Sequence, residues 1–470
     1  MSLSADNLTI VALATPPGRG SIACVRLSGP QAFSAVRGLL PRDKSAESFQ
    51  SNRVVLTWLY SRSGERLDQV TLVRYQKPHS YTGEDVVEIF CHGGRLIPNL
   101  IIEQLCAQGC RLAEPGEFTQ RALLHGKLDL IQAEAVADLV EAESPAYLHR
   151  ALAHLEGAFS RRLGALREQL LHACALLELG LDFSEEDVEF ADRAQIQREL
   201  LQLDELIAHL LKGFARGQAL KEGWRIAIIG KPNVGKSSLM NALLKYDRVI
   251  VSAIPGTTRD TIDERLFING LLFRLIDTAG IREHARDLAG EIEKIGIERS
   301  RAAAQNADVI LFVTDDSKDG DEADRILAQE CLDLKNKNGR GAVIHTRNKS
   351  DLPAAAKPFL FDKETAHAIR VSALSGAGID ALEHAIAGAV MPLSNLSGAE
   401  VQHINLRQKL CLEQARTALS GALSSLEKNL SAEFITVDLR EVIHQLGVLV
   451  GEVTTEDVLG EIFSKFCIGK

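Results

Sequence analysis

The sequence lacks long apolar runs, paired cysteines and an excess of basic residues. No apolar stretch approaches the ~20 residues of a membrane-spanning helix, and the N-terminus lacks the charged start and apolar block of a secretory signal. The eight cysteines include no C-x-x-C pair, and a disulfide framework is implausible in a chain of this length. We therefore expect a cytoplasmic protein with reduced thiols and no membrane segment.

The charge balance is acidic, with a formal net charge of −10. This balance argues against a strong nucleic-acid binder, which usually carries an overall basic charge, although a local basic patch remains compatible with it. With 46% hydrophobic and 25% charged residues, the composition is typical of a soluble globular protein. The 470 residues predict two to four domains.

Residues 1–125 predict an α+β domain. Apolar runs at 22–27, 54–59, 70–75 and 86–90 are typical of strands, and loops rich in glycine and proline separate them. Apolar residues then recur at helical spacing, which predicts the first part of an all-α domain over residues 126–221. In that part, Ser144 and Pro145 predict the start of a helix that continues to about residue 179. A further helix is expected over 194–211, followed by a linker at 213–223.

An α/β pattern occupies residues 222–390, with an Asn-Gly hairpin turn at 269–270. Residues 391–400 resemble a second linker, and residues 391–470 predict the second part of the helical domain, ending in a CIGK tail. The fold class expected is thus multidomain: an α+β N-terminal domain and a discontinuous helical domain with an α/β domain inserted into it.

The segment GKPNVGKS, residues 230–237, matches the phosphate-loop pattern G-x-x-x-x-G-K-[ST] between an expected strand and helix. Glycines let backbone N–H groups turn toward phosphate oxygens, and the helix directs the positive end of its dipole at them. Lys236 then faces the β- and γ-phosphates, and the Ser237 hydroxyl suits Mg²⁺. The predicted nucleotide contacts are Gly230, Asn233, Val234, Gly235, Lys236, Ser237 and Ser238.

Two later segments complete the phosphate and metal side of the predicted site. In DTAG, residues 277–280, an aspartate at a strand end can hold Mg²⁺ through water, and the Gly280 N–H can contact a γ-phosphate. In PGTTRD, residues 255–260, Thr258 is the residue expected to complete the Mg²⁺ shell. The predicted contacts are Thr257, Thr258, Asp277, Thr278, Ala279 and Gly280.

The segment NKSD, residues 348–351, follows an expected strand and fits the guanine-specific pattern N-K-x-D. The Asp351 carboxylate can accept hydrogen bonds from the ring N–H and the exocyclic amine of guanine together. Adenine offers neither donor there, and losing such a paired contact can cost ~10⁴ or more in discrimination. We predict Asn348, Lys349 and Asp351 as base contacts, with Ser372 and Ala373 closing over the base. Residues 345–347, HTR, are more polar than expected before this motif.

Water activation is not explained by these motifs. Many GTPases place a glutamine directly after D-x-x-G, but this sequence has Ile281, which cannot orient water. The sequence also identifies no arginine finger. Another group must therefore supply positive charge and position the water.

Over essentially its whole length, the sequence resembles the tRNA-modification GTPases of the MnmE (TrmE) family. The shared strings are ATPPGRG, GEDVVEIFCHGG, PGEFTQRA, GKLDLIQAEAVADL, GKPNVGKSSLMNAL, PGTTRD, DTAGIRE and the terminal FCIGK. The GTPase motifs occur in many families, whereas the N-terminal strings and the tail are specific to this one.

The resemblance implies that G domains dimerise across the nucleotides, with K⁺ in place of an arginine finger. A monovalent cation beside the phosphates would offset the developing charge. The K⁺ ligands implied are Asn233, Ser252, Ile254 and Thr257. The water-positioning residue implied is Glu293, with Glu291 as the alternative and a plain surface carboxylate as the competing interpretation.

The resemblance also implies that the N-terminal domain binds a tetrahydrofolate derivative, 5-formyl or 5,10-methylene, and forms a constitutive homodimer. The folate contacts implied are Arg26, Glu88, Lys127 and Lys470. Cys467 in the tail would lie near the folate, where a nucleophilic or activating role competes with simple packing.

The function implied is that of a K⁺-stimulated GTP hydrolase acting with an FAD-dependent MnmG-type partner. Together they would add an aminomethyl or carboxymethylaminomethyl group to carbon 5 of the wobble uridine in certain tRNAs. Two rivals are a GTPase switch for ribosome assembly and a folate-dependent one-carbon transferase acting alone. The N-terminal strings and the tail argue against the first, and transfer without any partner would favour the second.

Overall fold

The computed structural model describes residues 8–41, 50–182, 193–246, 264–276, 304–338, 341–357, 359, 368–390, 404–453 and 456–470. The chain divides into two compact units. The first comprises residues 1–141, 151–205 and 410–470, and the second comprises residues 142–150 and 206–409. Within the described ranges, no helix combines the length and the apolar character that a membrane crossing requires.

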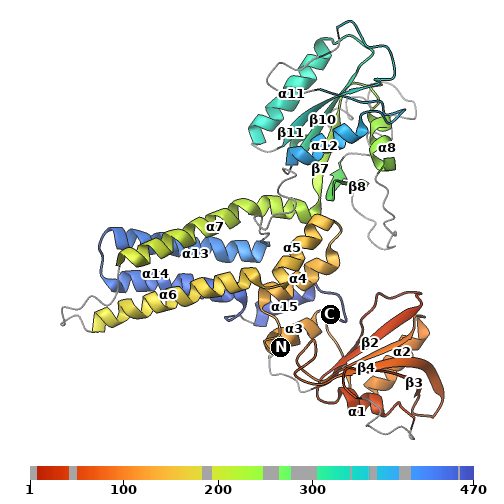
Figure 1. Cartoon of the computed structure of the whole chain (residues 1–470), viewed down its shortest axis with the longest axis vertical. Coiled ribbons are helices and arrows are strands. Elements are labelled where there is room, and N and C mark those ends of the chain that lie inside the picture. Colours follow the sequence, from red (N-terminus) through yellow and green to blue (C-terminus); the bar gives the residue numbers. More distant parts are fainter. Residues whose placement is uncertain are drawn as a thin grey trace. The chain divides into compact units, whose positions relative to one another are not determined.

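The first unit contains a six-stranded sheet with the order β3-β4-β5-β2-β1-β6 (Figure 1). All neighbouring strands in it are antiparallel except β1 and β6, which are parallel. The strands are β1 Ile10–Leu13, β2 Ile22–Ser28, β3 Val54–Tyr60, β4 Arg66–Tyr75, β5 Val86–His92 and β6 Arg111–Leu112. The four strands expected from the apolar runs are confirmed, and β1 and β6 were not expected.

Two helices, α1 (Ala32–Arg37) and α2 (Leu96–Cys106), share a core with the sheet. Because side chains alternate along a strand, every second residue reaches this core. Val25 and Leu27 of β2 and Val87 and Ile89 of β5 are fully buried there. Arg26 and Glu88, which pair across the same two strands, therefore lie on the opposite face of the sheet.

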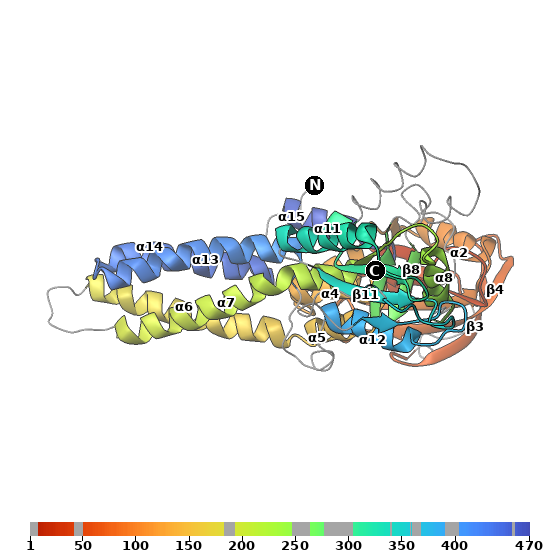
Figure 2. The same ribbon diagram turned by 90° about the horizontal axis from the view of Figure 1, so that it is seen from above.

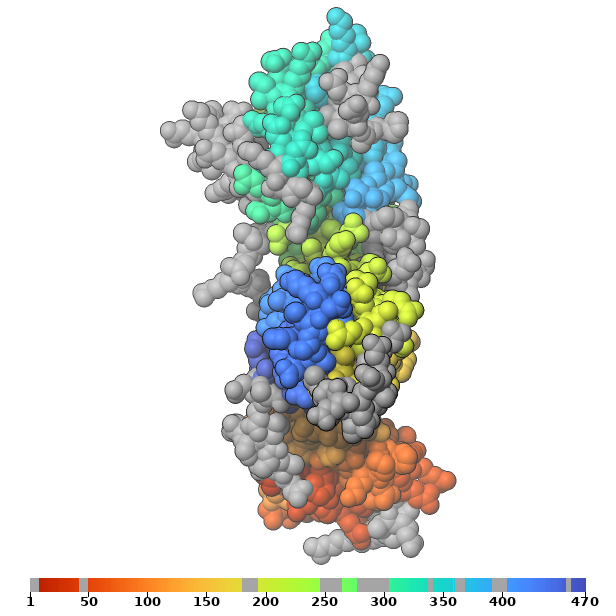
Figure 3. All heavy atoms as spheres, turned by 90° about the vertical axis from the view of Figure 1, so that its left-hand side faces the viewer, coloured from red at the N-terminus to blue at the C-terminus, as the bar shows by residue number. Residues whose placement is uncertain are grey.

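The helices that complete the first unit include an extended bundle (Figures 1 and 2). The helices are α3 Glu117–Leu124, α4 Leu130–Glu141, α5 Pro145–Leu155, α6 Ala158–Asp182, α7 Arg193–Glu222, α13 Leu406–Glu427, α14 Ala432–Val450 and α15 Glu456–Ser464. Parts of α5, α7 and α13 belong to the second unit. α6 and α14 lie side by side and bury apolar stripes that include Leu170 and Leu177 of α6 and Leu439 and Leu446 of α14. Figure 3 shows the C-terminal helices, in blue, packed against the yellow-green helices.

Two expectations about these helices are wrong. The helix expected from Pro145 to residue 179 is interrupted between α5 and α6, because Gly157 adopts a left-handed φ of 74° that ends α5. The linker expected at 213–223 is the last part of α7, which continues to Glu222. Leu220 near its end is 2% exposed, so packing stabilises the helix despite its two internal glycines. The start of α5 is confirmed: the Tyr147 N–H donates to Ser144 Oγ, 3.2 Å away.

The second unit contains a six-stranded sheet with the order β12-β11-β10-β7-β9-β8. Neighbours are parallel except β8 and β9, which form the expected hairpin with Asn269 and Gly270 at positive φ. The strands are β7 Trp224–Ile229, β8 Glu264–Ile268, β9 Leu271–Leu275, β10 Val309–Asp315, β11 Ala342–Asn348 and β12 Ile369–Arg370.

Helices cover both faces of this sheet. The elements are α8 Lys236–Tyr246, α11 Glu322–Asn338 and α12 Ile379–Val390. Leu311 and Val313 of β10 share a core with residues of α8 and α12, whereas Ile310 and Phe312 share one with residues of α11. Every residue of β10 is buried, as expected for a central parallel strand. In open sheets of this kind, ligands bind beyond the carboxyl ends of the strands.

Candidate nucleotide site and N-terminal cluster

The phosphate loop lies between β7 and α8, and close backbone approaches shape it. A Cβ added to Gly230 would meet the Val313 carbonyl oxygen at 2.3 Å, so only glycine fits there. Gly235 has a φ of 95°, and a Cβ there would meet Asn348 Nδ2 at 2.2 Å. Lys236 Nζ donates to the carbonyl oxygens of Gly230 and Lys231 at 2.7 and 2.9 Å. The lysine thus spans the loop from the first turn of α8, where the helix dipole favours anions.

Burial lowers the pKa of this lysine but leaves it positively charged at pH 7. Lys236 is half-buried, and burial lowers the pKa of its ammonium group to about 8. An ammonium group in a site of low polarity is stabilised by a nearby anion. The loop therefore holds a cation that gains from binding phosphate, as the sequence predicts.

Asn348 connects the NKSD segment to the phosphate loop. It is 2% exposed, and its Nδ2 donates to the carbonyl oxygens of Val234 and Gly235 at 3.0 and 3.4 Å. Its Oδ1 accepts from the Ala373 N–H at 3.1 Å. The Asn348 side chain thereby joins three segments that are distant in the sequence.

Lys349 adds a second connection to the phosphate loop. Its Nζ donates to the Asn233 carbonyl oxygen at 2.8 Å and to Asp315 Oδ2 at 2.7 Å. Burial alone would raise the pKa of Asp315, but hydrogen bonds from Lys349 and Ser317 hold it below its usual value. The ionised carboxylate keeps the Lys349 chain extended along the site.

Asp351 and Ser372 face each other at the end of the sheet. Ser372 is fully buried, and its Oγ donates to Asp351 Oδ1 at 2.6 Å. Asp351 itself is exposed, so its second carboxylate oxygen is accessible to a base. The geometry brings together the predicted residues Asn233, Val234, Gly235, Lys236, Asn348, Lys349, Asp351, Ser372 and Ala373.

The remaining predicted residues of the G domain divide into two groups. Ser237 and Ser238 lie in the first turn of α8 directly after Lys236, the position from which a hydroxyl can reach a metal ion bound to the phosphates. Several others lie outside the described residues: Ser252, Ile254, Thr257, Thr258, Asp277, Thr278, Ala279, Gly280, Ile281, Glu291 and Glu293.

The N-terminal sheet carries a second polar cluster, on its face away from α1 and α2. Arg26 and Glu88 form an ion pair of 2.8 Å, and both side chains are largely buried. The guanidinium carbon of Arg26 lies 5.7 Å from the ring centroid of Tyr81 and 5.8 Å from that of Phe118. Lys127 Nζ donates to the Pro78 carbonyl oxygen at 3.1 Å. A cluster of aromatic and cationic side chains of this kind suits a flat, anionic ligand.

The C-terminal tail reaches this cluster. The Arg26 Nη1 donates to the Gly469 carbonyl oxygen at 3.3 Å, and the Gly116 N–H donates to the Cys467 carbonyl oxygen at 3.5 Å. Burial lowers the pKa of Lys470, and the positive charge of Arg26 lowers it further. Cys467 is exposed, and it is a free thiol like the other seven cysteines. Arg26, Glu88 and Lys470 are thus close together, with Cys467 in the adjoining turn.

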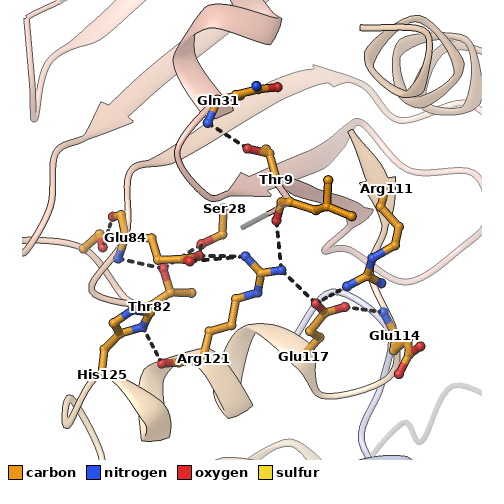
Figure 4. A network of polar contacts seen from close by, with 12 residues as sticks. Thr9, Ser28, Gln31, Thr82, Glu84, Arg111, Glu114, Glu117, Arg121 and His125 are labelled. Carbon is orange, nitrogen blue, oxygen red and sulfur yellow. Dashed lines mark hydrogen bonds and ion pairs between the residues drawn. The ribbon is translucent and has the colours of Figure 1, made fainter. Parts of the chain in front are cut away.

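A buried ion-pair network holds α3 against the sheet beside this cluster (Figure 4). Arg121 pairs with Glu84 at 3.0 Å and with Glu117 at 2.9 Å. Burial alone would raise the pKa of Glu117, but hydrogen bonds from Arg111, the Glu114 N–H and Arg121 lower it. Glu84 in turn accepts from the Ser28 hydroxyl at 2.7 Å. The network fixes the helix that supplies Phe118.

Several residues of these sites were missed by sequence reasoning. They are Asp315, Asp316, Tyr81, Phe118, Arg111 and Arg121. For Asp315 and Asp316 a signal existed, because two adjacent acidic residues stand at the end of the strand that begins with the apolar run 309–313. For Tyr81 and Phe118 the sequence offers no signal, since Arg26 lies tens of residues away in the chain. Arg121 and Arg111, in contrast, lie only four residues after and six residues before their shared partner Glu117.

Strand, phosphate loop, helix and base-binding edge together define a P-loop G domain of the GTPase class. Family models match almost the whole chain: "GTP-binding protein TrmE N-terminus" over residues 9–127 and "MnmE helical domain" over residues 130–467. The chain belongs to the MnmE family of tRNA modification GTPases, and it is accordingly a GTP-hydrolysing enzyme.

Relatives named tRNA modification GTPase MnmE match over their full lengths. The protein of Parabacteroides distasonis is 42% identical over 468 residues, which are 98% of this chain and 100% of the relative. That of a Synechococcus species is 41% identical, covering 99% and 98%. That of Thermotoga maritima is 39% identical, covering 98% and 100%. The resemblance in the sequence is therefore confirmed, as is the expected multidomain fold.

Proposed function

We propose that this chain is a K⁺-stimulated GTPase that modifies tRNA together with an FAD-dependent MnmG-type partner. The reaction adds an aminomethyl or carboxymethylaminomethyl group to carbon 5 of the wobble uridine, using a one-carbon unit of tetrahydrofolate. The observation that carries the proposal is the full-length match to tRNA modification GTPases. The candidate nucleotide site and the polar cluster around Arg26 in the N-terminal sheet are consistent with it. The acidic net charge favours the partner as the main contact of the tRNA.

In this proposal the nucleotide phosphates bind over the phosphate loop. Lys236 and the N–H groups at the start of α8 hold the β- and γ-phosphates, and Asp351 accepts from the guanine edge. The residues that would hold Mg²⁺ are Ser237 and Thr258, and hydroxyl oxygens suit that ion. Bound Mg²⁺ supplies charge neutralisation at the phosphates. Glu293 as the residue that positions water stays a prediction.

The proposed K⁺ ligands are Asn233, Ser252, Ile254 and Thr257, of which the structure describes Asn233. This residue is exposed in the phosphate loop, with a φ of 65° that turns the loop toward the phosphates. Its own carbonyl oxygen is held by Lys349, which leaves the side-chain amide to reach a cation. A cation there would act at the α- and γ-phosphates as an arginine finger does.

We expect faster GTP hydrolysis in KCl than in NaCl at equal ionic strength, because the two ions differ in size while nonspecific screening is the same. Asn233→Ala should remove the difference. Asn233→Gly should do the same while keeping the positive φ without strain, which separates the lost ligand from a distorted loop. Equal steady-state rates of phosphate release in both salts for the unmodified chain would eliminate the K⁺ mechanism and leave the GTPase assignment intact.

The proposed folate site is the cluster around Arg26, with Glu88, Lys127 and Lys470. Tyr81 and Phe118 provide ring faces for a pterin, and Glu88 provides an acceptor for its donors. The lowered pKa of Lys470 reflects burial and the positive charge of Arg26, and a bound carboxylate would relieve that repulsion. These residues therefore fit an anionic, partly aromatic ligand such as a 5-formyl or 5,10-methylene folate.

Cys467 is proposed to take part in this chemistry as a nucleophile or activating group. We expect Cys467→Ser to impair tRNA modification while GTP hydrolysis stays normal, because the thiol lies in the tail beside Lys470 and not in the nucleotide site. Cys106→Ser, at a partly buried thiol on α2, is the matched control. Normal tRNA modification by the Cys467 variant, assayed by nucleoside analysis, would show that the residue only packs.

The proposed homodimer is supported by the outer strand β3. Val54, Leu56 and Trp58 alternate along it, and they are 69%, 60% and 37% exposed. Their side chains share one face of the edge strand, a surface that is commonly covered by another chain. We also propose the domain limits 1–125, 126–221, 222–390 and 391–470, and a cytoplasmic location.

Mass spectrometry of tRNA nucleosides from cells with and without the protein tests the proposed function. Loss of the carbon-5 modification of wobble uridine would support it. An unchanged nucleoside profile would reject the tRNA substrate, and the chain would then be a GTPase switch with a folate-sensing domain. Cells that lack the protein and are complemented with the Lys236→Met variant show whether the modification requires GTP hydrolysis or only the presence of the protein.

A further inference from the structure

The strand that precedes NKSD carries buried polar residues. His345 and Thr346 of β11 are 2% and 0% exposed, and Arg347 follows them before Asn348. His345 Nε2 and Thr314 Oγ1 of the neighbouring strand β10 lie 2.9 Å apart. Burial lowers the pKa of His345 to about 4, so its ring is neutral at pH 7. The unexpected polarity of HTR therefore belongs to a cluster shared with the end of β10.

The centre of this cluster is the Asp316 carboxylate, which is completely buried. It forms ion pairs with two arginines from two strands, Arg347 of β11 and Arg370 of β12. Arg370 donates through both Nε and Nη2, at 2.9 and 2.7 Å. The Arg347 side chain is 13% exposed, whereas that of Arg370 is 52% exposed. Asp316 thus neutralises the charge of Arg347, whose side chain is nearly buried.

The backbone of Asp316 encloses the NKSD segment as well. Its N–H donates to the Asn348 carbonyl oxygen at 2.8 Å, at the start of that segment. Its carbonyl oxygen accepts from the Ala355 N–H at 3.0 Å, just beyond the end of the segment. The backbone of Asp316 is therefore hydrogen-bonded both to the first residue of the NKSD segment and to a residue shortly after its end.

The two arginines continue directly into the two base-binding loops. Arg347 precedes Asn348, and Arg370 precedes Ser372 by two residues. The Val371 N–H donates to the Arg347 carbonyl oxygen at 2.8 Å, and the Ser350 N–H donates to the Val371 carbonyl oxygen at 3.1 Å. A carboxylate that pulls both arginines together consequently sets the distance between Asp351 and the Ser372 loop.

We propose that Asp316 is a positioning residue for guanine selectivity, holding the NKSD segment and the Ser372–Ala373 loop in register through Arg347 and Arg370. The inference rests on the proposed base-binding role of Asp351. Asp316 does not itself face the base, and it acts by keeping the Asp351 carboxylate where it meets both guanine donors. In enzymes, misplacement of a group by about 1 Å can cost on the order of 10²-fold in rate. A buried residue that fixes the position of the Asp351 carboxylate can therefore have a large effect.

The test compares GDP with IDP, whose base lacks the exocyclic amine of guanine. In the full-length protein, dissociation constants for both are measured by competition against a fluorescent GDP analogue. Asp316→Asn removes the negative charge and keeps the shape. We expect a loss of GDP affinity of about tenfold or more, by analogy with residues that orient metal ligands, whose mutation costs about 10–100-fold. The loss for IDP should be smaller, so the GDP-to-IDP preference falls.

Arg370→Gln provides a second variant, because its half-exposed side chain can be removed without burying an unpaired charge. We expect a smaller fall of the same preference. Arg325→Gln is the matched control: it breaks an exposed ion pair with Glu322 on α11, and it should leave the preference unchanged. If Asp316→Asn shows no cooperative thermal unfolding, it is not folded and its affinities are not interpretable. The proposal is then tested by whether the GDP-to-IDP preference is lower in Arg370→Gln than in Arg325→Gln.

The outcomes separate the inference from the function on which it rests. Asp351→Asn must abolish the GDP-to-IDP preference if Asp351 reads the base. If Asp351→Asn abolishes the preference while Asp316→Asn and Arg370→Gln retain it, Asp316 has no positioning role and the base site stands. If Asp351→Asn also retains it, the base site is elsewhere and both proposals are overturned.

Discussion

We expect Asp351→Asn to lower the affinity for GDP by about 10⁴-fold, the scale on which a site rejects a ligand whose paired polar groups are unmet. The aspartate has two acceptor oxygens, and Ser372 Oγ occupies one side of Oδ1 at 2.6 Å. An asparagine replaces one acceptor with a donor, which then faces a donor of guanine. Xanthine carries a carbonyl at that position, so the affinity for XDP should rise in the same variant.

Equilibrium competition against fluorescent GDP and XDP measures both changes. Asp333→Asn is the matched control and should leave both affinities unchanged, because Asp333 is an exposed carboxylate on α11 that accepts a hydrogen bond from Gln329 of the same helix. GDP binding by the Asp351 variant at the level of the unmodified chain would contradict a base-reading role for NKSD. It would not affect the assignment of the phosphate loop.

The second large effect is expected at Lys236. Lys236→Met should reduce the rate of GTP hydrolysis by about 10²–10³-fold, as removal of one preorganised charge at a reacting centre does. The lysine is the cation that spans the loop from Gly230 to α8. Lys245→Met removes an exposed lysine from the last turn of the same helix, and phosphate release by that variant should be normal. If Lys236→Met and Lys245→Met hydrolyse GTP at comparable rates, Lys236 does not have the proposed role at the phosphates.

The pKa of Lys236 also predicts a pH dependence. It is about 8 in the free protein, and the negative phosphates raise it in the complex. Below pH 8 the ammonium group is charged in both states, so affinity is constant. Above pH 8 binding requires proton uptake, and the affinity for GTP should fall by up to about tenfold per pH unit. Lys236→Arg should lose this dependence, because guanidinium stays protonated; an unchanged profile would assign the titration to another group.

Contiguous motifs account for what could be predicted from the sequence. The phosphate loop spans residues 230–237, from the end of β7 into the first turn of α8, and its glycines, lysine and serine act through local backbone geometry. The strands of the N-terminal sheet, the hairpin at Asn269 and the start of α5 at Pro145 likewise depend on neighbours in the chain. Local patterns were less reliable at element ends, because packing of Leu220 extends α7 through the expected linker.

Contacts between distant residues decided the rest. Asp316 meets Arg347 and Arg370, which lie 31 and 54 residues later, and nothing in the local sequence around any of them indicates the pairing. In the same way, Arg26 meets the Gly469 carbonyl across 443 residues. A buried charge needs a partner wherever the fold places one, so its neighbours follow from the arrangement of strands and not from spacing in the chain. The sequence therefore establishes the nucleotide chemistry and the family, whereas the tertiary structure decides how the base-binding loops are held and where the tail docks.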